Sequence, residues 1–456
     1  MSSYEGIKKG KKGLFFLLEK LRKEPMQSAM EELEINQSQG RHYIEEIQER
    51  KLQGLLKHCY KNSEFYRKLY DAQGVSPESI TSVNELRKLP TIKKEDIRRD
   101  FNQVHSANAP KAYPVKTSGA TGSPLKFYKD RVASAYSYAA MYRGLKWHGL
   151  DLCDREAYLW GIPIDKKERM LARSRDFVLN RFREKEFSLT DDVFGDFYSK
   201  MLRLRPKFLS GYSSFLYEFA LFIRKKGLPI DQIKPKIVKY TAEMMHDFQR
   251  EVVEEVFSCP VVGEYGSAEI GVMAYQCAYK NYHVFNDCCI LEFDETEHEG
   301  LYEIIATNLH ARAFPFIRYR TGDLVESPEF SVCPCGAPFP VIGHIIGRRA
   351  DVVVTPQGKR IHCNIFSYII KHLIKNGYGF DRVLFVQKEI SRIQMLTIPS
   401  MEKDKQFKNS LKKLVHETIS PEMEIEVGPF FNSTYRERRK LRYFVSELSL
   451  YSYDRI

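Results

Sequence analysis

The chain has 456 residues, of which 43% are hydrophobic and 29% charged, and its formal net charge is +12. This length and composition indicate a folded protein of two or more domains and exclude a largely disordered chain. The sequence has no run of roughly eighteen apolar residues, which a membrane-spanning helix needs. The nine cysteines follow no disulfide-framework spacing, and no secretory signal pattern opens the chain. We therefore expect a cytoplasmic protein.

The first expected element is a short helix with a strong basic bias. Lys8, Lys9, Lys11 and Lys12 precede the apolar run at residues 14–18. Basic residues beside a short apolar helix are typical of an interfacial membrane anchor. A helix that packs on the body and exposes its basic face to solvent has the same pattern. Peripheral contact with the inner face of a membrane is therefore one of two expectations.

Apolar spacing predicts the organisation of the rest of the chain. Residues 1–99 are expected to be mostly helical, because apolar side chains recur there every three or four residues. Over residues 113–262, short apolar runs alternate with helical stretches, which predicts βα units and a parallel-rich sheet, and strand-like runs dominate 283–324. We expect an α/β fold with a large N-terminal domain over 1–346 and a small, mobile α+β domain over 347–456.

The stretch KTSGATGSP concentrates small residues between a lysine and a proline. Glycines let the backbone approach an anion closely, and hydroxyl and N–H groups supply donors, so the stretch favours a phosphate cradle. It is not a P-loop, because Gly122 is followed by Ser123 and Pro124. A flexible surface loop explains the same residues.

Two later turns carry groups suited to a nucleotide. In GEYGSAEIG, Tyr265 is placed to stack on a base and Glu269 to bind Mg²⁺ beside phosphates. In FPFIRYRTGDL, Asp323 is placed to accept both hydroxyls of a ribose, and Arg318 and Arg320 to face phosphate. The alternatives are a hairpin turn with a surface glutamate and a structural arginine–aspartate bridge.

Two basic groups follow these turns. Arg348 lies in GRRAD at the inferred domain boundary, and Lys440 lies in the basic cluster YRERRKLR. A lysine on a small mobile domain would reach a reacting carbonyl and phosphate. A solvated basic surface is the alternative for Lys440.

Three cysteines and one histidine have the ligand count of a structural zinc site. Cys277 and His283 form one pair and Cys333 and Cys335 the other, although the Cys-x-Cys spacing is tighter than usual. The remaining candidates are His344 and His362 as substitute ligands and Cys288 and Cys289 as core thiols.

In their order along the chain, these motifs resemble those of the adenylate-forming superfamily. The resemblance is strongest to its phenylacetate–coenzyme A ligase-like, CapK-like branch, which includes proteins of capsular polysaccharide biosynthesis. SGATGSP is similar to the family loop S-G-T-T-G-x-P and differs at Ala120, while YGSAE, RYRTGD and GRRAD are similar to Y-G-x-x-E, Y-R-T-G-D and G-R-x-x-D. Further similarity in KLQGLLKHCYKNSEFYRKLYDAQGV and LPTIKKEDIR extends the resemblance over nearly the whole chain. The branch also carries Cys/His segments at corresponding places, which favours zinc.

The resemblance implies a large N-terminal adenylate-forming domain and a two-step reaction. A carboxylate attacks the α-phosphorus of ATP and gives an acyl-adenylate and pyrophosphate. A thiol, commonly that of coenzyme A, then displaces AMP. The expected partners are therefore ATP, Mg²⁺, coenzyme A and a small carboxylic acid, and rotation about Asp351 is expected to expose the thiolation face.

The resemblance also implies roles for individual residues. Lys440, Thr121 and Glu269 are implied to be catalytic, and Lys440 to bridge the carboxylate and the α-phosphate. The implied nucleotide-binding residues are Thr117, Ser118, Gly119, Thr121 and Gly122 at the phosphates, Glu243, Tyr265, Gly266 and Ser267 near the adenine, and Asp323 and Arg348 at the ribose and its phosphate. Glu243 has a second interpretation, as an acid at a helix N-terminus. Arg439 departs from the glycine that usually precedes the family's lysine.

Substrate identity cannot be read from the motifs. The aromatic residues Trp147, Tyr158, Trp160 and Tyr212 are expected to line or back an acyl pocket, or else to be core. Two rival functions are an adenylating enzyme that transfers the acyl group to an amine and a catalytically degenerate, zinc-containing binding protein. Nucleic acid is not an expected partner, because 59 acidic residues temper the basic charge and no nucleic-acid-reading motif accompanies it.

Overall fold

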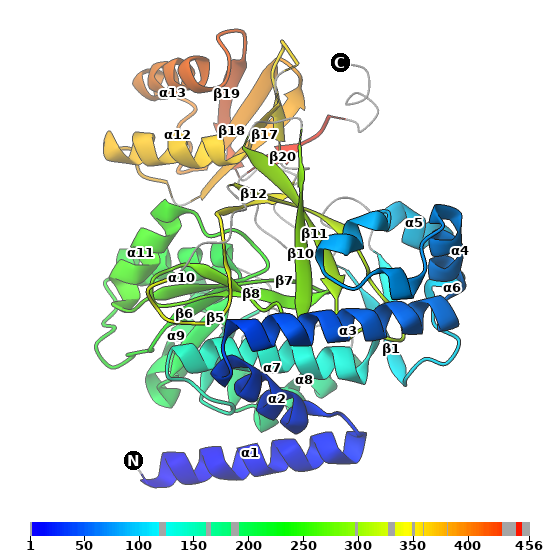
Figure 1. The fold of residues 1–456 in the computed structure, drawn as a ribbon. Helices are drawn as coiled ribbons and strands as arrows, with labels where there is room; N and C mark the ends of the chain where they lie inside the picture. Colours follow the sequence, from blue (N-terminus) through cyan, green and yellow to red (C-terminus); the bar gives the residue numbers. More distant parts are fainter. Residues whose placement is uncertain are drawn as a thin grey trace.

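Figure 1 shows the protein as a computed structural model. The structure describes residues 2–117, 125–160, 166–183, 191–296, 300–326, 333–348, 352–358, 360–380, 382–430 and 444–448. Within these ranges, no helix is both long enough and apolar enough to cross a membrane.

The first hundred residues are mostly helical, as their apolar spacing predicts. The helices are α1 (Ser2–Arg22), α2 (Met26–Ser38), α3 (Arg41–Asn62), α4 (Glu64–Gln73), α5 (Lys94–Arg99) and α6 (Phe101–Val104), with 3₁₀ turns at Pro77–Ser79 and Asn84–Lys88. On α2, Met26, Ala29 and Leu33 are buried because this side of the helix packs on α7 (Arg131–Trp147). Helix α4 ends at Gly74, whose φ of +63° is the left-handed conformation that glycine adopts most readily.

A mixed eight-stranded sheet forms the centre of the molecule, with strand order β13-β9-β8-β7-β6-β5-β3-β4. Its strands are β3 (Glu156–Leu159), β4 (Arg181–Arg183), β5 (Phe208–Gly211), β6 (Val238–Thr241), β7 (Val261–Ser267), β8 (Gly271–Gln276), β9 (Tyr282–Val284) and β13 (Val341–Ile342). The strands from β4 to β7 are parallel, which confirms the prediction from the alternating pattern, and the remaining pairings are antiparallel. The intervening helices are α8 (Lys166–Val178), α9 (Asp191–Leu204), α10 (Ser213–Lys226) and α11 (Asp247–Phe257).

Helix α7 packs closely on the central sheet. A Cβ on Gly144 would lie 2.3 Å from the ring of Tyr275 on β8, so a larger residue would separate the helix from the sheet. At the start of α7, Asp130 accepts a hydrogen bond from the Ala133 N–H over 2.8 Å. The second carboxylate oxygen of Asp130 accepts from the backbone N–H groups at residues 312–313, which ties α7 to the loop before β12.

A second sheet of four antiparallel strands stands beside the first. Its order is β10 (Cys289–Glu295), β11 (Leu301–Asn308), β12 (Tyr319–Glu326) and β14 (Ile345–Arg348). A separate hairpin of β1 (Ala112–Lys116) and β2 (Lys126–Asp130) leads into α7. Sheet and hairpin share one apolar core with helices α3 and α4.

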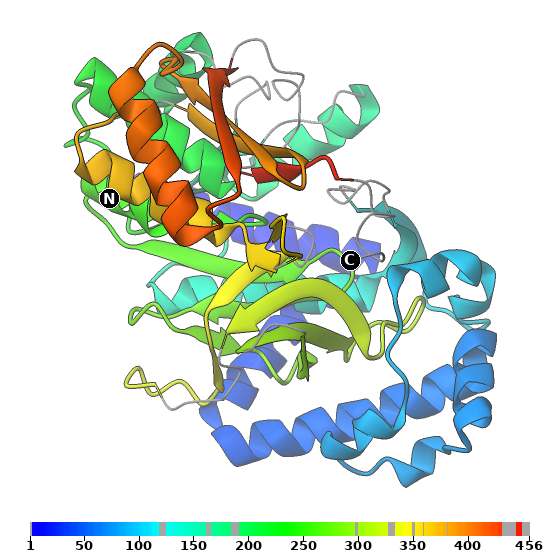
Figure 2. The ribbon, with the colours of Figure 1, turned by 90° about the horizontal axis from the view of Figure 1, so that it is seen from above.

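The last part of the chain is a small α+β unit, as predicted. It contains the pair β15 (Val352–Val354) and β16 (Arg360–His362), the sheet of β17 (Arg382–Glu389), β18 (Arg392–Ile398), β19 (Glu424–Pro429) and β20 (Phe444–Ser446), and helices α12 (Asn364–Lys375) and α13 (Lys405–Thr418). Figure 1 shows this unit above α10 and α11, and Figure 2 shows it on one side of the molecule, away from α4–α6. The ion pair between Arg382 and Glu218, 3.4 Å apart, joins β17 to α10. The domain boundary at residues 346–347 stays a prediction.

A buried ion pair joins three elements of the N-terminal part. The guanidinium of Arg143 on α7 donates to both oxygens of Asp287, over 2.8 and 2.9 Å, and Asn36 on α2 donates to the same carboxylate over 3.0 Å. Burial raises the pKa of Asp287, but the Arg143 guanidinium outweighs that effect and lowers it to about 2. The carboxylate therefore stays charged at neutral pH.

We expect Arg143→Met to destabilise the protein strongly. Removal of one partner from a buried pair leaves an uncompensated charge and costs about 3–5 kcal/mol of the free energy of unfolding. Urea unfolding followed by circular dichroism measures this change. Arg99→Met is the control, because Arg99 pairs with Asp96 and Asp100 at the exposed surface and its loss should change the midpoint little. Similar midpoints for both variants would contradict the prediction.

Candidate functional site

Thr117 closes the base of the predicted phosphate loop. Its N–H donates to the carbonyl of Leu125, and its Oγ1 accepts from the N–H of Leu125, each over 2.9 Å. These bonds extend the β1–β2 ladder, in which Lys116 pairs with Lys126. The rest of the predicted cradle lies outside the described residues: Ser118, Gly119, Thr121 and Gly122. The described flanks thus hold the two ends of that loop side by side.

The turn between β7 and β8 carries Glu269. The Oγ of Ser267 accepts from the N–H of Ile270 over 3.1 Å, and the side-chain amide of Asn308 donates to the carbonyls of Glu269 and Ile270 over 3.2 and 2.9 Å. Position 266 requires glycine, because a Cβ added there would lie 2.5 Å from a carbonyl oxygen of β8. No sequence motif signals Asn308, because it reaches the turn from the distant end of β11. These contacts fix the turn that presents Glu269.

The two predicted nucleotide turns face each other. The hydroxyl of Tyr265 on β7 donates to Asp323 Oδ2 over 2.9 Å, and the hydroxyl of Tyr319 donates to Glu269 Oε1 over 3.3 Å. Arg348 lies directly opposite Asp323 in the β12–β14 pairing, although its side chain lies outside the described part. Asp323 and Glu269 are both partly exposed. The fold therefore brings three of the predicted motifs to one place.

Arg318 and Arg320 belong to structural ion pairs. Arg318 is buried, and its Nε donates to Glu292 over 3.0 Å. Arg320 binds Glu303 over 2.6 Å and Asp294 over 2.8 Å across the strands of the same sheet. Of the two expectations for these arginines, the structure supports a bridge to carboxylates rather than contact with phosphate.

Lys129 lies beside the same turn, and the sequence motifs do not point to it. Its Nζ donates to the carbonyl of Ala268 over 3.4 Å. Burial lowers the pKa of this amine, and the charges of Glu269 and Asp130 oppose that shift. Lys129 reaches the turn because β1 pairs with β2, so the position of this lysine depends on tertiary structure. The hairpin that carries the predicted phosphate loop thus contacts the predicted magnesium turn.

Glu243 follows the end of β6, next to β7 in the parallel sheet. Its carboxylate accepts from the N–H and hydroxyl of Ser214 over 3.1 and 2.6 Å, at the start of α10. The preceding residue, Ala242, has a φ of +66°, a conformation rare for a residue with a Cβ. The structure supports the interpretation of Glu243 as an acid at a helix N-terminus, and contact with adenine stays a prediction.

Three of the four predicted pocket aromatics stack at the carboxyl ends of parallel strands. The rings of Tyr158 and Trp160 lie 5.4 Å apart, and those of Trp160 and Tyr212 lie 3.9 Å apart. Ligands of open α/β sheets usually bind at this edge. Trp147 lies elsewhere, with its ring 5.5 Å from that of His283, so it is core beside the cysteine cluster.

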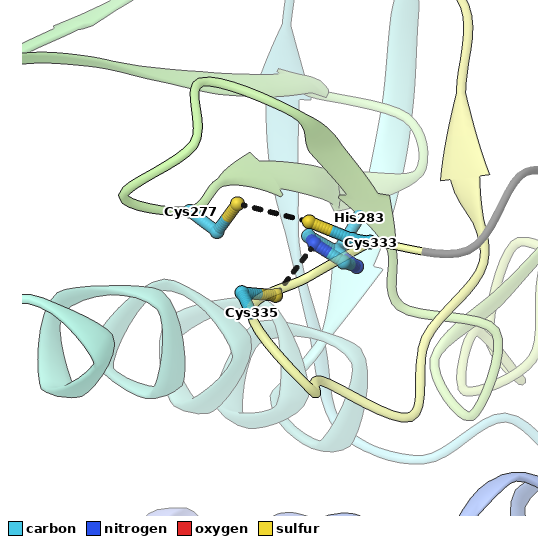
Figure 3. Close-up of side chains that lie close together, drawn as sticks. All are labelled: Cys277, His283, Cys333 and Cys335. Atoms are coloured by element: carbon cyan, nitrogen blue, oxygen red, sulfur yellow. Dashed lines mark hydrogen bonds between the residues drawn. The ribbon is translucent and has the colours of Figure 1, made fainter.

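The four predicted zinc ligands come together, and their ligand atoms all lie within 4.8 Å of one another (Figure 3). The sulfur atoms of Cys277 and Cys333 lie 3.7 Å apart, and Cys335 Sγ lies 3.2 Å from His283 Nε2. A tetrahedral zinc ion with bonds of about 2.3 Å would place its sulfur ligands about 3.8 Å apart. The cluster therefore fits zinc in ligand type, number and spacing.

The surroundings of the cluster orient its ligands. His283 Nδ1 lies 2.8 Å from the carbonyl of Phe339, and a carbonyl only accepts, so Nδ1 carries the proton and Nε2 faces the sulfur atoms. Burial raises the pKa of Cys333, but hydrogen bonds, from Asn281 first, lower it to about 6. A thiolate at neutral pH suits a metal ligand.

The other metal candidates are separate from this cluster. His344 is exposed and interacts with His246, and the side chain of His362 lies outside the described residues. Cys288 and Cys289 are buried in the core, and burial raises the pKa of both thiols, which agrees with the prediction of core cysteines.

Two predicted features of the C-terminal part cannot be placed. Lys440 and Asp351 lie outside the described residues. Their roles stay predictions.

Known proteins are similar to this chain over most of its length. No protein-family model matches it. Protein CapK of Staphylococcus aureus is 24% identical over 375 residues, which are 82% of this chain and 82% of that protein. A phenylacetate–coenzyme A ligase of Thermus thermophilus is 25% identical over 337 residues, which are 69% of this chain and 72% of that enzyme.

A crystal structure of a 2-hydroxyisobutyryl-CoA ligase in the postadenylation state, in complex with 2-HIB-AMP, has a similar fold. The TM-score is 0.68 at 16% identity, over 91% of this chain and 90% of that one. The fold likeness thus covers about nine-tenths of both chains. The chain is therefore similar in sequence, over most of its length, to CapK and to phenylacetate–coenzyme A ligases, and similar in fold to a coenzyme A ligase.

Proposed function

We propose that the protein activates a small carboxylic acid with ATP and transfers the resulting acyl group to the thiol of coenzyme A. The hydrogen bonds from Tyr265 to Asp323 and from Tyr319 to Glu269 carry the proposal. They join β7 and its turn, which carries the proposed magnesium ligand, to β12, which carries the proposed ribose acceptor. Two of the similar proteins are, by name, ligases of small carboxylic acids and coenzyme A. They support this substrate class.

In the first step, a carboxylate oxygen of the acid bonds to the α-phosphorus of ATP, and the bond from that phosphorus to pyrophosphate breaks. Asp323 accepts the ribose hydroxyls, while the Tyr265 hydroxyl holds the orientation of its carboxylate. The loop that starts at Thr117 donates to the leaving pyrophosphate. Lys440 bridges the attacking carboxylate and the α-phosphate, where negative charge accumulates.

Glu269 is the proposed magnesium ligand. Its carboxylate is a hard oxygen donor, is partly exposed, and accepts a hydrogen bond from Tyr319, which orients it. When bound, magnesium would neutralise charge on phosphate oxygens. Lys129 would add a second positive charge at the same turn.

In the second step, the sulfur of the thiol attacks the acyl carbon, and AMP leaves as the carbon–oxygen bond breaks. Residues beyond the boundary near Gly347 rotate between the steps, so that Lys440 withdraws and the thiolation face opens. The stacked rings of Tyr158, Trp160 and Tyr212 flank the acyl group. A contribution to polysaccharide biosynthesis is part of the proposal, and it rests on the motif resemblance to the CapK-like branch.

ATP–pyrophosphate exchange tests the proposal. Exchange should require one acid from a panel of aryl, acyl, amino and hydroxy acids, and thioester should form only with coenzyme A present. Lys440→Ala should lower exchange by roughly 10- to 100-fold, because one hydrogen bond to a charged group is worth about 1.5–3 kcal/mol. Lys412→Ala on the exposed side of α13 is the matched control and should keep the wild-type rate.

Three results would contradict the proposal. If none of the acids in a broad panel supports exchange, the protein would instead be a degenerate binding protein. Transfer of the acyl group to an amine in the absence of coenzyme A would show that the acceptor is an amine and not a thiol. Full activity of Lys440→Ala would show that another residue supplies the catalytic positive charge.

A further inference from the structure

Helix α1 exposes a line of large apolar side chains. Ile7, Leu14, Leu17 and Leu21 are 48%, 37%, 55% and 72% exposed, and their spacing places them on one side of the helix. Helix α8, which contacts α1, exposes Met170, Leu171 and Phe177 by 64%, 59% and 65%. Seven of the twelve large apolar side chains that remain exposed in the described ranges therefore lie on two neighbouring helices. Such a concentration marks an interaction surface rather than ordinary surface composition.

The basic side of α1 faces the protein, so its apolar side faces outward. Lys8 pairs with Asp154 and Lys12 with Asp151, each over 2.8 Å. The hydroxyl of Tyr4 accepts from the backbone N–H of residue 155 over 2.9 Å. Phe15 and Phe16 are partly buried and pack against the core, whereas the line of exposed apolar residues does not. Figure 1 shows α1 at the end of the molecule opposite the C-terminal unit.

The charges left at the border of the apolar line are mostly basic. Lys9 and Lys20 are both exposed. They are eleven residues apart, which is about three helical turns, so they lie along one border of the apolar line. Arg22 and Lys23 are exposed at the end of the helix. Among the side chains that the structure describes on α1 and α8, Glu5 is the exposed acid. Lysines beside a buried apolar stripe extend toward anionic headgroups.

We propose that the exposed faces of α1 and α8 form a docking surface for an anionic lipid bilayer. The apolar line would enter the boundary between headgroups and acyl chains, and Lys9 and Lys20 would contact lipid phosphate. The helix would lie on the membrane and stay attached to the protein, because Lys8 and Lys12 already hold its other side. The C-terminal unit, at the far end in Figure 1, would remain uncovered.

The composition of the outward side agrees with this partner. Gly6, Gly10 and Gly13 are exposed, and a Cβ on any of them would meet nothing within 4 Å. Glycine weakens a helix, so three of them make α1 depend on contacts from outside its own sequence. A second copy of the chain is a poorer partner, because Lys9 and Lys20 would meet the same basic residues across a symmetric contact.

Sedimentation with lipid vesicles tests the surface on the full chain. Wild-type protein should bind vesicles of phosphatidylcholine mixed with phosphatidylglycerol, bind pure phosphatidylcholine weakly, and dissociate as salt rises. The double variant L17Q/L21Q should lower the affinity at least roughly tenfold, since burial of one leucine is worth about tenfold or more. The charge reversal K9E/K20E should weaken binding to the anionic vesicles by a similar factor.

Matched controls separate this surface from general properties of the protein. Ile374→Gln removes an exposed apolar residue of α12, and K412E/K413E makes the same charge change on α13. Both should bind like wild type, and all variants should keep the wild-type circular dichroism because the replaced side chains are exposed. The proposal is overturned if wild type ignores anionic vesicles, or if the controls lose as much affinity as the test variants. If wild type does not bind lipid but has twice the mass of one chain in solution, and L17Q/L21Q halves that mass, the surface is instead an interface between two copies of the chain.

Discussion

Asp323→Ala is expected to lower acid-dependent ATP–pyrophosphate exchange by roughly two to four orders of magnitude. The variant would lose two hydrogen bonds between a charged carboxylate and the ribose hydroxyls, each worth about 1.5–3 kcal/mol. It would also remove the acceptor of the Tyr265 hydroxyl, which lies 2.9 Å from Asp323 Oδ2. Exchange measured at several ATP concentrations separates weaker ATP binding from slower chemistry.

Asp294→Ala is the matched control for Asp323→Ala. Asp294 lies on β10 of the same sheet and pairs with Arg320 over 2.8 Å, and Arg320 keeps its second partner, Glu303, when Asp294 is removed. Its replacement should leave exchange close to wild type. Equal losses in both variants would show that the effect arises from damage to the sheet, and an active Asp323→Ala would remove this residue from the ribose site.

Cys277→Ser is expected to abolish binding of zinc. The purified wild-type protein should carry one zinc ion per chain, because the three sulfur atoms and His283 Nε2 lie within 4.8 Å of one another. The variant should carry none and should melt several degrees lower, since a structural zinc ion adds its binding free energy to the folded state. Plasma mass spectrometry and thermal unfolding measure the two effects.

A chelator and a second cysteine variant complete the zinc test. A strong chelator should lower the melting temperature of wild type and leave that of Cys277→Ser unchanged. Cys259→Ser, which alters a cysteine outside the cluster, should retain both zinc and the response to chelator. Wild-type protein without zinc, or Cys277→Ser with a full complement of it, would contradict the assignment.

Loss of zinc should also affect catalysis indirectly. Cys277 follows β8, His283 lies on β9, and Cys333 and Cys335 precede β13, so the ion would tie the loop after β12 to the central sheet. Strand β8 pairs with β7, which carries Tyr265, and β12 carries Asp323. A bound zinc ion would therefore brace the two strands that hold the proposed ribose contact.

Much of the fold follows from local patterns in the sequence. Apolar alternation over residues 113–262 predicts the parallel strands β3–β7, because buried parallel strands and their crossover helices have distinct periods. The spacing of apolar residues near the C-terminus predicts α12 and α13 for the same reason. The Cys/His ligand set is also visible, since its residue types are rare and chemically specific.

The partners of charged residues could not be predicted in the same way. Arg318 is bound to Glu292, and Arg320 is bound to Glu303 and Asp294. These acids lie on β10 and β11, 17 to 26 residues before their partners in the chain. Asn308 and Lys129 contact the Glu269 turn from other elements. Such contacts depend on strand register and hairpin direction, which no local pattern specifies.

The sequence by itself determined the family motifs, their order, the main secondary structure and the zinc ligand set, because each depends on residue type and short-range spacing. The tertiary structure alone decided which motifs meet and which face of α1 is exposed. The amphipathic pattern of α1 is compatible with either orientation. Asp151 and Asp154, far along the chain, attract Lys12 and Lys8 and so turn the leucines outward.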